Sequence, residues 1–486
     1  MNKFNFRFVT KTLGFLLIIE SLFMMTATVI SFYKHEFSGD AMLASSAITL
    51  VAGIIFRLIG FEEYEKPIGK RESFLTVTLS WVVMSAFGML PFYFSGVIPN
   101  ISDAYFETMS GFTTTGSTVI IDIDSVPYGI HFWRSITQWI GGIGIIVFAL
   151  VLLPVVGGNA SVLYDAEVTG ISKERFRPRA SQVAKRLWAT YLLVTGILFM
   201  LLWVGPMNAF DAICHAMSTM STGGYSTKQE SIAFWHSRYI EYIIAVFMFI
   251  GGTNFSLIYF LFKGKPQKLF KDEEFRWYFT ICMSFVIIVA VCLFVSGQIT
   301  DPEQSFRTSL FQVVSVITTT GFATADYVQW GAFYTFVICL LMLFCACAGS
   351  TSGGIKIVRV VVLCKNAINE FKRQVHPNAV LPVRLNGSVV PMETVTKILA
   401  FMFLYLGILV VSFLILSFSG MTFEESIGSA VTCMGNVGPG LGANGPNGHF
   451  ADIPVFSKWY LSFLMLTGRL ELFTVLSLFI PAFWKK

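Results

Sequence analysis

The chain has 486 residues, of which 55% are hydrophobic and only 13% are charged, and its mean hydropathy is +0.68. Soluble domains carry roughly a quarter charged residues, so this composition excludes an ordinary soluble globular protein. The net charge of +5 is small, and the distribution of the charges is therefore more informative than their sum.

The N-terminus carries three basic residues before an apolar run that continues to Phe32. A signal peptide has a shorter apolar core followed by a cleavage site of small residues, so we predict a retained first span. A second apolar run follows closely. Residues 8–33 and 40–60 are therefore expected to form a helical hairpin, which the polar stretch 61–67 separates from the rest of the chain.

Four short stretches rich in glycine and hydroxyl groups recur after this hairpin. Aligned on Gly116, Gly223, Gly321 and Gly438, they lie 107, 98 and 117 residues apart. A short semi-apolar segment precedes each stretch, and long hydrophobic runs flank it. One such loop alone is common, whereas four in register indicate a repeated unit. The stretches are Thr113-Thr114-Thr115-Gly116-Ser117, Ser221-Thr222-Gly223-Gly224-Tyr225, Thr318-Thr319-Thr320-Gly321-Phe322 and Gly435-Asn436-Val437-Gly438-Pro439.

Each repeated unit is predicted to contain a span, a half-helix, a glycine loop and a second span. Half-helices such as Ile101–Phe112 and Phe423–Met434 are too short to cross a bilayer, which takes about 20 residues. The predicted segments are 73–95, 101–118 and 129–154; 187–204, 208–224 and 238–262; 276–297, 305–322 and 332–363; and 394–419, 423–439 and 456–484.

The sequence therefore predicts an all-α polytopic membrane protein. It has four pseudo-symmetric helix–pore loop–helix repeats around a central pore, in addition to the N-terminal two-helix hairpin. The predicted units are 1–62 for the hairpin, then 63–156, 157–264, 265–380 and 381–486 for the four repeats.

The charges along the chain predict its orientation. The connectors 157–187, 263–276 and 356–397 hold six, five and seven Lys or Arg residues. The segments that contain the glycine loops hold only Lys228 and Arg307, together with twelve acidic residues. Cytoplasmic loops are enriched in Lys and Arg, so we expect the connectors and both termini in the cytoplasm of a multi-pass protein of the cell inner membrane. The outer acidic residues either concentrate cations at the mouth or are simply solvated; they include Asp122, Asp124, Glu424 and Asp452.

The glycine loops have the chemistry of a cation site. Irregular backbone within a membrane must be buried in protein or face water and ions. Glycine permits the positive-φ conformations that let successive carbonyl groups face one axis, where they can replace the hydration shell of a cation. Oxygen ligands suit alkali cations. The predicted filter residues are Thr114, Thr115, Gly116, Ser221, Thr222, Gly223, Thr319, Thr320, Gly321, Asn436, Val437 and Gly438.

The fourth loop differs from the others because Asn436-Val437 replaces the hydroxyl residues. A filter with fewer ordered carbonyl layers than a TVGYG sequence is expected to discriminate K⁺ from Na⁺ less sharply.

The second span of the third repeat is interrupted by small and hydroxylated residues, Cys345-Ala346-Cys347-Ala348-Gly349-Ser350-Thr351-Ser352-Gly353-Gly354-Ile355-Lys356. Three glycines weaken a helix, so we predict irregular backbone in the cavity below the filter. Close helix packing is the alternative explanation. The spacing of a phosphate-binding GxxxxGK[ST] loop is absent.

The last span carries Arg469, and an arginine at membrane depth is costly unless it faces a wet cavity or a partner. In an unbroken helix it would lie about 24 Å from the chain end, at 1.5 Å per residue, which is too far for its side chain to reach the surface. It either lines the pore or forms a structural ion pair. Glu471, about 200° further round the helix, is expected to contact a neighbouring segment instead of Arg469.

The other candidate sites have simpler explanations. The eight cysteines form no CxxC pair and are predicted to be packing residues, not disulfides or zinc ligands. Trp133-Arg134 is interpreted as an interface anchor and Gly141-Gly142-Ile143-Gly144 as a helix contact. The histidines lack metal-ligand spacing. We therefore predict no enzymatic site, organic cofactor or nucleic-acid partner.

On the four loops, the segment 345–356 and the motif Thr467-Gly468-Arg469-Leu470-Glu471-Leu472-Phe473, the chain resembles the membrane subunits of Trk-type potassium uptake systems. These form the TrkH/TrkG branch of the Trk/Ktr/HKT superfamily. The resemblance covers essentially the whole chain, including the N-terminal hairpin that the Ktr branch lacks. It implies K⁺ as the transported ion, a channel-like path, a homodimer and a cytosolic, nucleotide-binding TrkA-type regulatory subunit.

The resemblance also implies an intramembrane gate and a place for Arg469 in the pore wall. The implied gate residues are Ala348, Gly349, Ser350, Thr351, Ser352, Gly353, Gly354 and Arg469.

Two alternatives remain open at this point. A K⁺ symporter coupled to H⁺ or Na⁺ is possible, although carriers often use inverted repeats and these repeats run in one direction. The basic connectors 173–186 and 365–373 could bind the regulatory subunit or anionic membrane lipid.

Overall fold

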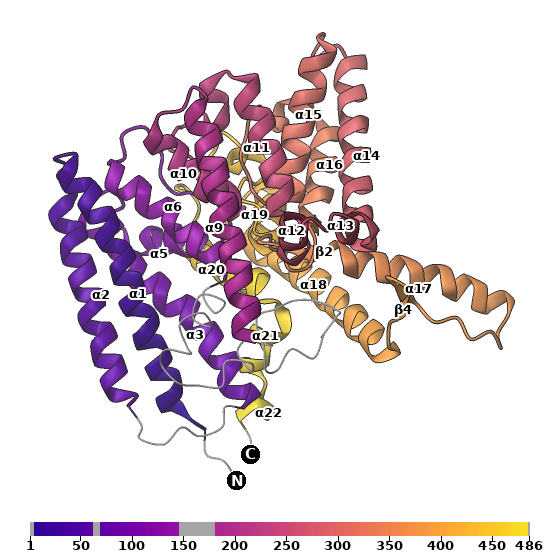
Figure 1. Cartoon of the computed structure of the whole chain (residues 1–486), viewed down its shortest axis with the longest axis horizontal. Helices are drawn as coiled ribbons and strands as arrows, with labels where there is room; N and C mark the ends of the chain where they lie inside the picture. The colour runs from indigo at the N-terminus through magenta and orange to yellow at the C-terminus, as the bar shows by residue number, and fades with distance from the viewer. Residues whose placement is uncertain (1–3, 62–68, 145–179, 485–486) are drawn as a thin grey trace.

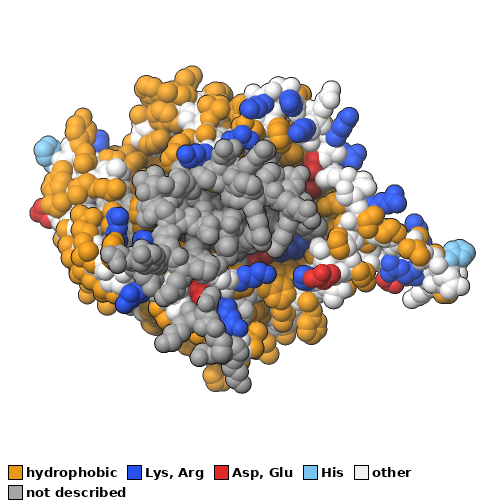
Figure 2. Space-filling model, turned by 60° about the horizontal axis from the view of Figure 1, so that its bottom comes forward, with side chains coloured by type: hydrophobic (Ala, Val, Ile, Leu, Met, Phe, Trp, Pro, Cys, Tyr) orange, Lys and Arg blue, Asp and Glu red, His pale blue; other side chains and the backbone are white. Residues whose placement is uncertain are grey.

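The computed structural model describes residues 4–61, 69–144 and 180–484, and these residues form an almost entirely helical protein (Figure 1). Within these ranges, six helices are long and apolar enough to cross a membrane, or eight if each of two sharply bent helix pairs counts as one span. The outer helices expose apolar side chains such as Val410, Leu414 and Phe418. Figure 2 shows hydrophobic side chains around the rim of the molecule, as a lipid-facing surface requires.

The chain begins with the predicted helical hairpin, drawn in indigo at one edge of Figure 1. It consists of α1 (Phe6–Tyr33) and α2 (Gly39–Ile59). The two helices approach closely where Gly14 faces Gly53, since a Cβ atom on either glycine would lie within 3 Å of the other helix's backbone. Small residues permit such contacts between membrane helices.

The first repeat contains a kinked span, a half-helix and a second helix. Its elements are α3 (Lys70–Gly88), α4 (Leu90–Phe94), α5 (Ile101–Phe112) and α6 (Tyr128–Gly142). The predicted span 129–154 can be followed to residue 144, and its remainder lies outside the described residues. Most of the connector 157–187 and the pair Lys485-Lys486 also lie outside them.

The second repeat corrects one prediction. Its elements are α9 (Ala180–Val204), α10 (Ala209–Met220), η1 (Ser231–Trp235), α11 (Arg238–Gly251) and α12 (Phe255–Phe262). The single span predicted over 238–262 is wrong, because α11 and α12 meet at an angle of 110°.

The third repeat contains the predicted interruption. Its elements are α13 (Gln267–Lys271), α14 (Glu273–Val295), α15 (Pro302–Ile317), η2 (Tyr327–Trp330), α16 (Ala332–Leu343), β1 (Phe344–Cys345), β2 (Ile355–Lys356) and α17 (Ile357–Val375). The helix stops at Leu343 and resumes at Ile357, which confirms the break. Strands β1 and β2 pair in parallel, so they close the irregular segment between them into a loop.

The fourth repeat corrects a second prediction. Its elements are β3 (Arg384–Leu385), β4 (Ser388–Val389), α18 (Met392–Phe418), α19 (Phe423–Gly435), η3 (Gly442–Asn444), α20 (Val455–Leu470), α21 (Leu472–Leu476), η4 (Ser477–Phe479) and α22 (Pro481–Trp484). The helix predicted over 456–484 is not continuous. Glu471 has a φ of 63°, and the chain bends there by 117°. The distance estimated for Arg469 from an unbroken helix is therefore wrong.

The two ends of the described chain lie side by side. The rings of Phe4 and Trp484 are 6.0 Å apart, at the bottom of Figure 1. Figure 2 brings this side forward, and it carries many Lys and Arg side chains and few acidic ones. The predicted boundaries at 62/63 and 156/157 lie outside the described residues, and all four boundaries between the predicted units remain a prediction.

Candidate functional site

Each glycine loop follows a half-helix that begins at a polar capping residue. The side chains of Asn100, Asn208 and Asp301 accept backbone N–H groups at the starts of α5, α10 and α15. Helix α19 begins with a reciprocal capping box between Thr422 and Glu425. Such caps satisfy N–H groups that have no partner within the helix. The local sequence therefore fixes where each half-helix starts.

Two residues in each loop adopt a left-handed conformation. The first has a φ between 54° and 58° and is Thr114, Thr222, Thr319 or Asn436. The second, two residues later, has a φ between 82° and 109° and is Gly116, Gly224, Gly321 or Gly438. Glycine adopts this conformation without steric cost, whereas a threonine there is strained and must be held by its surroundings.

The predicted alignment is wrong by one residue in the second loop. Gly224, and not Gly223, is the left-handed counterpart of Gly116. Gly223 instead occupies the position of Thr115 in the first loop. The glycines that correspond in space are therefore 108, 97 and 117 residues apart. The sequence was ambiguous here because two glycines are adjacent.

The backbone hydrogen bonds confirm this corrected alignment. In every loop, the residue before the left-handed glycine donates its N–H to the carbonyl oxygen five residues earlier. The pairs are Thr115–Ser110 at 2.9 Å, Gly223–Ser218 at 2.9 Å, Thr320–Ser315 at 2.8 Å and Val437–Thr432 at 3.0 Å.

The four loops contact one another in a closed ring. A Cβ atom added to Gly116 would lie within 3 Å of the carbonyl oxygen of Gly223 in the next loop. In the same way, a Cβ atom added to each of the other three glycines would lie within 3 Å of a carbonyl oxygen in the next loop. The pairs of glycine and carbonyl are Gly224 and Thr320, Gly321 and Val437, and Gly438 and Thr115. Because the fourth loop returns to the first, all four surround one centre, and no side chain fits at the four glycine positions.

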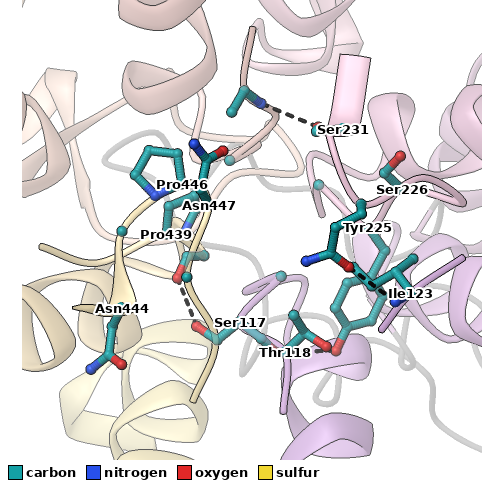
Figure 3. A pocket seen from close by; sticks show the side chains of 18 of the residues that line it. Ser117, Thr118, Ile123, Tyr225, Ser226, Ser231, Pro439, Asn444, Pro446 and Asn447 are labelled. Atoms are coloured by element: carbon teal, nitrogen blue, oxygen red, sulfur yellow. Dashed lines mark hydrogen bonds between the residues drawn. The ribbon is translucent and has the colours of Figure 1, made fainter. Parts of the chain in front are cut away.

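An open pocket lies on one side of this ring, and the four left-handed glycines line it (Figure 3). Ser117, Tyr225 and Pro439, which follow the glycines, also face it. Its charged lining residues, all within the described ranges, are Arg134 and Lys228. None of the acidic residues Asp122, Asp124, Glu424 and Asp452 lines the pocket, and all four are exposed. Asp124 lies 3.9 Å from Lys228, which does line it, and the acidic mouth stays a prediction.

Arg134 is buried behind the first two loops and is not an interface anchor as predicted. Its Nε lies 2.9 Å from Glu107, and both side chains are almost completely buried. The guanidinium also stacks 4.1 Å from the centre of the Tyr225 ring and donates to the carbonyl oxygen of Ser226. Glu107 accepts further bonds from Thr118 and from a backbone N–H. A buried ion pair is tolerated when such additional hydrogen bonds complete it.

Besides this buried ion pair, neutral side chains also form hydrogen bonds to the loops. Gln138 of α6 donates to the carbonyl oxygen of Gly223 at 2.6 Å and accepts the hydroxyl of Ser218. Ser117 donates to the carbonyl oxygen of Gly438 at 2.8 Å. Asn436 donates to the hydroxyl of Thr115 at 2.9 Å. The first loop is therefore bonded directly to the fourth, although they lie more than 300 residues apart.

The segment between β1 and β2 lies on the other side of the ring from the pocket. It contacts the loop residues that precede the glycines, whereas the pocket contacts those that follow. The Thr351 hydroxyl is 3.2 Å from that of Thr222 and donates to the carbonyl oxygen of Met220 at the end of α10. Gly353 donates its N–H to the Thr319 hydroxyl at 3.1 Å.

The same segment explains the bend between α11 and α12. Cys347 donates its N–H to the carbonyl oxygen of Gly252, and Phe255 donates to that of Gly349. Backbone groups that an unbroken helix would pair internally are bonded to this segment instead. On α14, Glu274 accepts the N–H of Ala348 at 2.6 Å.

Arg469 contacts this segment directly. Its guanidinium donates to the carbonyl oxygen of Thr351 and to those of Gly141 and Gly142, the latter two at 2.7 and 3.0 Å. Glu471 forms an ion pair with Arg359 of α17, which confirms that it contacts a neighbouring segment. Gly141 is also a close helix contact as predicted, since a Cβ atom there would overlap the carbonyl of Phe112.

The structure therefore brings the predicted loop residues to one ring, and Ala348–Gly354 and Arg469 to one side of it. Glu107, Gln138 and Glu274 were not predicted to belong to the site, and Arg134 was assigned a different role. Glu107 and Arg134 did carry a signal, because opposite charges in two apolar segments of one repeat suggest a buried pair.

A polytopic helical protein in which four non-helical loops meet at one centre belongs to the class of membrane ion-transport proteins. More specifically, the chain belongs to the TrkH family, described as cation transport proteins, which matches residues 42–486.

Individual relatives cover the whole chain. It is 37% identical to the Trk system potassium uptake protein TrkH of Escherichia coli K12, over 99% of this chain and 100% of that protein. It is 33% identical to TrkG of the same organism, over 100% of both chains. The crystal structure of the potassium transporter TrkH from Vibrio parahaemolyticus matches with a TM-score of 0.89 and 34% identity, covering 99% of this chain and 100% of that one.

Proposed function

We propose that this protein takes up K⁺ across the cell membrane and that the ring of four loops is its selectivity filter. The observation that carries the proposal is the closed ring, in which each left-handed glycine faces a carbonyl oxygen of the next loop. The choice of K⁺ rests on the relatives, which are named potassium uptake proteins.

In this proposal, backbone oxygens of the loops replace water around the ion. The carbonyls of Thr115, Gly223, Thr320 and Val437 are the closest to the neighbouring loops. Gln138 and Ser117 hold two of the carbonyl groups of the ring by hydrogen bonds and so fix their direction. A carbonyl oxygen has two lone pairs, so one such bond leaves it able to bind a cation.

The four half-helices provide a second, longer-range contribution. Helices α5, α10, α15 and α19 all end where a glycine loop begins. A helix C-terminus carries about half a negative charge from its free carbonyl groups. Four such ends around one path favour a cation over an anion.

We propose further that Ala348–Gly354 and Arg469 form the gate. Thr351 and Gly353 bond to loop residues of two repeats on the side away from the pocket. Arg469 bonds to the same segment and places a positive charge on the proposed path, which opposes occupancy by K⁺. Ion passage then requires this segment to move.

We also propose the protein's orientation in the membrane and its partners. The termini and the basic connectors are cytoplasmic, and the basic side in Figure 2 is consistent with this. The protein is a homodimer in the inner membrane and works with a cytosolic, nucleotide-binding subunit of the TrkA kind. The four repeats all run in one direction, so we favour a channel-like path over coupled carriage.

Purified protein in liposomes tests these points. With a K⁺ gradient, the reversal potential should follow K⁺ alone, whereas a shift with ΔpH or with Na⁺ would support a coupled symporter. Gly321→Ser should abolish selective K⁺ flux, because its Cβ would overlap the carbonyl of Val437. Arg469→Ala should raise the flux through the closed form. Unchanged transport in the first variant would contradict the filter, and unchanged gating in the second would exclude Arg469.

A further inference from the structure

Glu274 of α14 contacts the gate segment directly. Its Oε1 accepts the N–H of Ala348 at 2.6 Å, and its side chain is buried. Glu274 lies on α14, which contributes nothing to the ring of loops, so this bond attaches the segment to a helix outside the ring.

The two residues before Glu274 are attached to the exposed turn between β3 and β4. Asn386 accepts the N–H of Glu273 at 2.7 Å and donates its backbone N–H back to the Glu273 carboxylate at 3.1 Å. Its side-chain amide also donates to Asp272 at 2.9 Å. Three hydrogen bonds therefore join this turn to the N-terminus of α14.

The turn is accessible and conformationally defined. Asn386 and Gly387 both have positive φ values, 49° and 77°, as a tight hairpin turn requires. Residues 386–389 are exposed. Glu273 additionally forms an ion pair with Lys365 of α17, the helix that directly follows the gate segment. The hairpin, α14 and α17 thus meet at one place.

We propose that Glu274 is a positioning residue for the gate and that the β3–β4 hairpin, through Asp272 and Glu273, sets the position of Glu274. Displacement of the hairpin moves the first turn of α14, lengthens the bond to Ala348 and releases the gate segment. This inference rests on the proposed gate. It adds that the exposed β3–β4 hairpin acts on the gate through the first turn of α14.

Three substitutions separate the steps of this route. Glu274→Ala removes the acceptor, whereas Glu274→Gln keeps an oxygen that can accept the same N–H. Asn386→Gly removes the side-chain bonds but retains a residue that adopts a positive φ freely. Glu393→Ala is the matched control, because that exposed carboxylate contacts Lys397 on its own helix and not the gate.

The first readout is K⁺ flux in liposomes without any activating partner. Loss of this bond leaves the buried N–H of Ala348 without its acceptor and should raise the flux about tenfold in Glu274→Ala, and Asn386→Gly should raise it about threefold. Glu274→Gln and Glu393→Ala should stay within about twofold of the wild type. The ratio of K⁺ to Na⁺ flux should not change, because the ring is not altered.

The second readout is the rate at which a thiol reagent modifies Cys347, which is buried beside Ala348. The exposed Cys364 is replaced by serine in all variants. Glu274→Ala and Asn386→Gly should speed the modification of Cys347 while Cys214 and Cys433, buried elsewhere, stay protected.

Wild-type rates at Cys347 in both variants would overturn the proposal. Simultaneous exposure of Cys214 and Cys433 would overturn it too, because it would mean general unfolding. If the wild-type protein carried no K⁺, the proposed function would fail, whereas the Cys347 rates would still test the role of Glu274.

Discussion

The ring of loops and the segment 344–356 are both irregular backbone inside a helical protein, yet they are stabilised in different ways. The ring uses one set of backbone hydrogen bonds four times, and each loop supports the next. The segment occurs once and is held by side chains from other helices, among them Glu274 and Arg469, and by backbone bonds to the junction of α11 and α12.

This difference suggests which region can move. Displacing one loop would disturb its neighbours around the whole ring, as well as the buried pair of Glu107 and Arg134. Releasing the segment breaks its bonds to several separate elements but leaves the backbone bonds within each loop intact, and its helix has already ended at Leu343. Contacts that support one another favour a rigid ring, and independent contacts favour a segment that can move, as the proposed gate requires.

The largest expected effect comes from the ion pair behind the ring. Arg134→Met leaves Glu107 as an uncompensated buried charge, so we expect a loss of about 3–5 kcal/mol in the free energy of unfolding. Thermal unfolding in detergent measures this loss. The double variant Glu107→Gln/Arg134→Met should recover part of it. A single variant as stable as the wild type would show that the pair does not stiffen the ring.

The next prediction tests the corrected alignment of the second loop. Gly224→Ala places a side chain against a backbone carbonyl and in a left-handed conformation, whereas at Gly223 it meets the side chain of Gln138. Strain of roughly 1–3 kcal/mol should make the loss of K⁺ uptake about tenfold greater for Gly224→Ala. Growth on limiting K⁺ compares the two. A greater loss of K⁺ uptake in Gly223→Ala than in Gly224→Ala would instead support the original alignment on Gly223.

A smaller effect should follow from loosening the gate. Thr351→Val removes the hydroxyl that bonds to Met220 and Thr222 but keeps the size of the side chain. Loss of about 1 kcal/mol should raise the flux through the closed form about fivefold. The matched control is Thr335→Val, whose hydroxyl donates to the carbonyl oxygen of Gly331, the residue before α16. An equal flux from both variants would mean that Thr351 does not hold the gate.

The smallest effect is expected at the mouth of the pocket. Lys228→Ala removes a positive charge that lies 3.9 Å from Asp124 and faces the pocket. Half-maximal uptake should shift to a lower K⁺ concentration by less than about twofold, and the shift should vanish in high salt because such charges are screened. A shift that persists in high salt would indicate a direct role for Lys228 in binding.

Much of this architecture follows from local sequence. The hairpin, the half-helices and the break after Leu343 were predicted because apolar length, polar capping residues and runs of glycine act within a few residues. The bounds of α5 match the prediction of Ile101–Phe112. The loops were recognised because their composition is repeated.

Other features depended on contacts that no local pattern contains. The position of Gly224, and not Gly223, in the ring is set by the carbonyl of Thr320, almost 100 residues later. At the bend between α11 and α12, the segment 344–356 bonds to backbone groups that an unbroken helix would pair internally. Arg134 is buried because Glu107 lies opposite it on another helix.

The sequence by itself thus determined the spans, the half-helices and the repeated loops, since helix formation and chain breaking depend on neighbouring residues. Only the tertiary structure decided which oxygens face which glycines, where the long helices bend and which charges are paired. Those outcomes depend on backbone and side-chain groups that meet only after the four repeats have assembled around one centre.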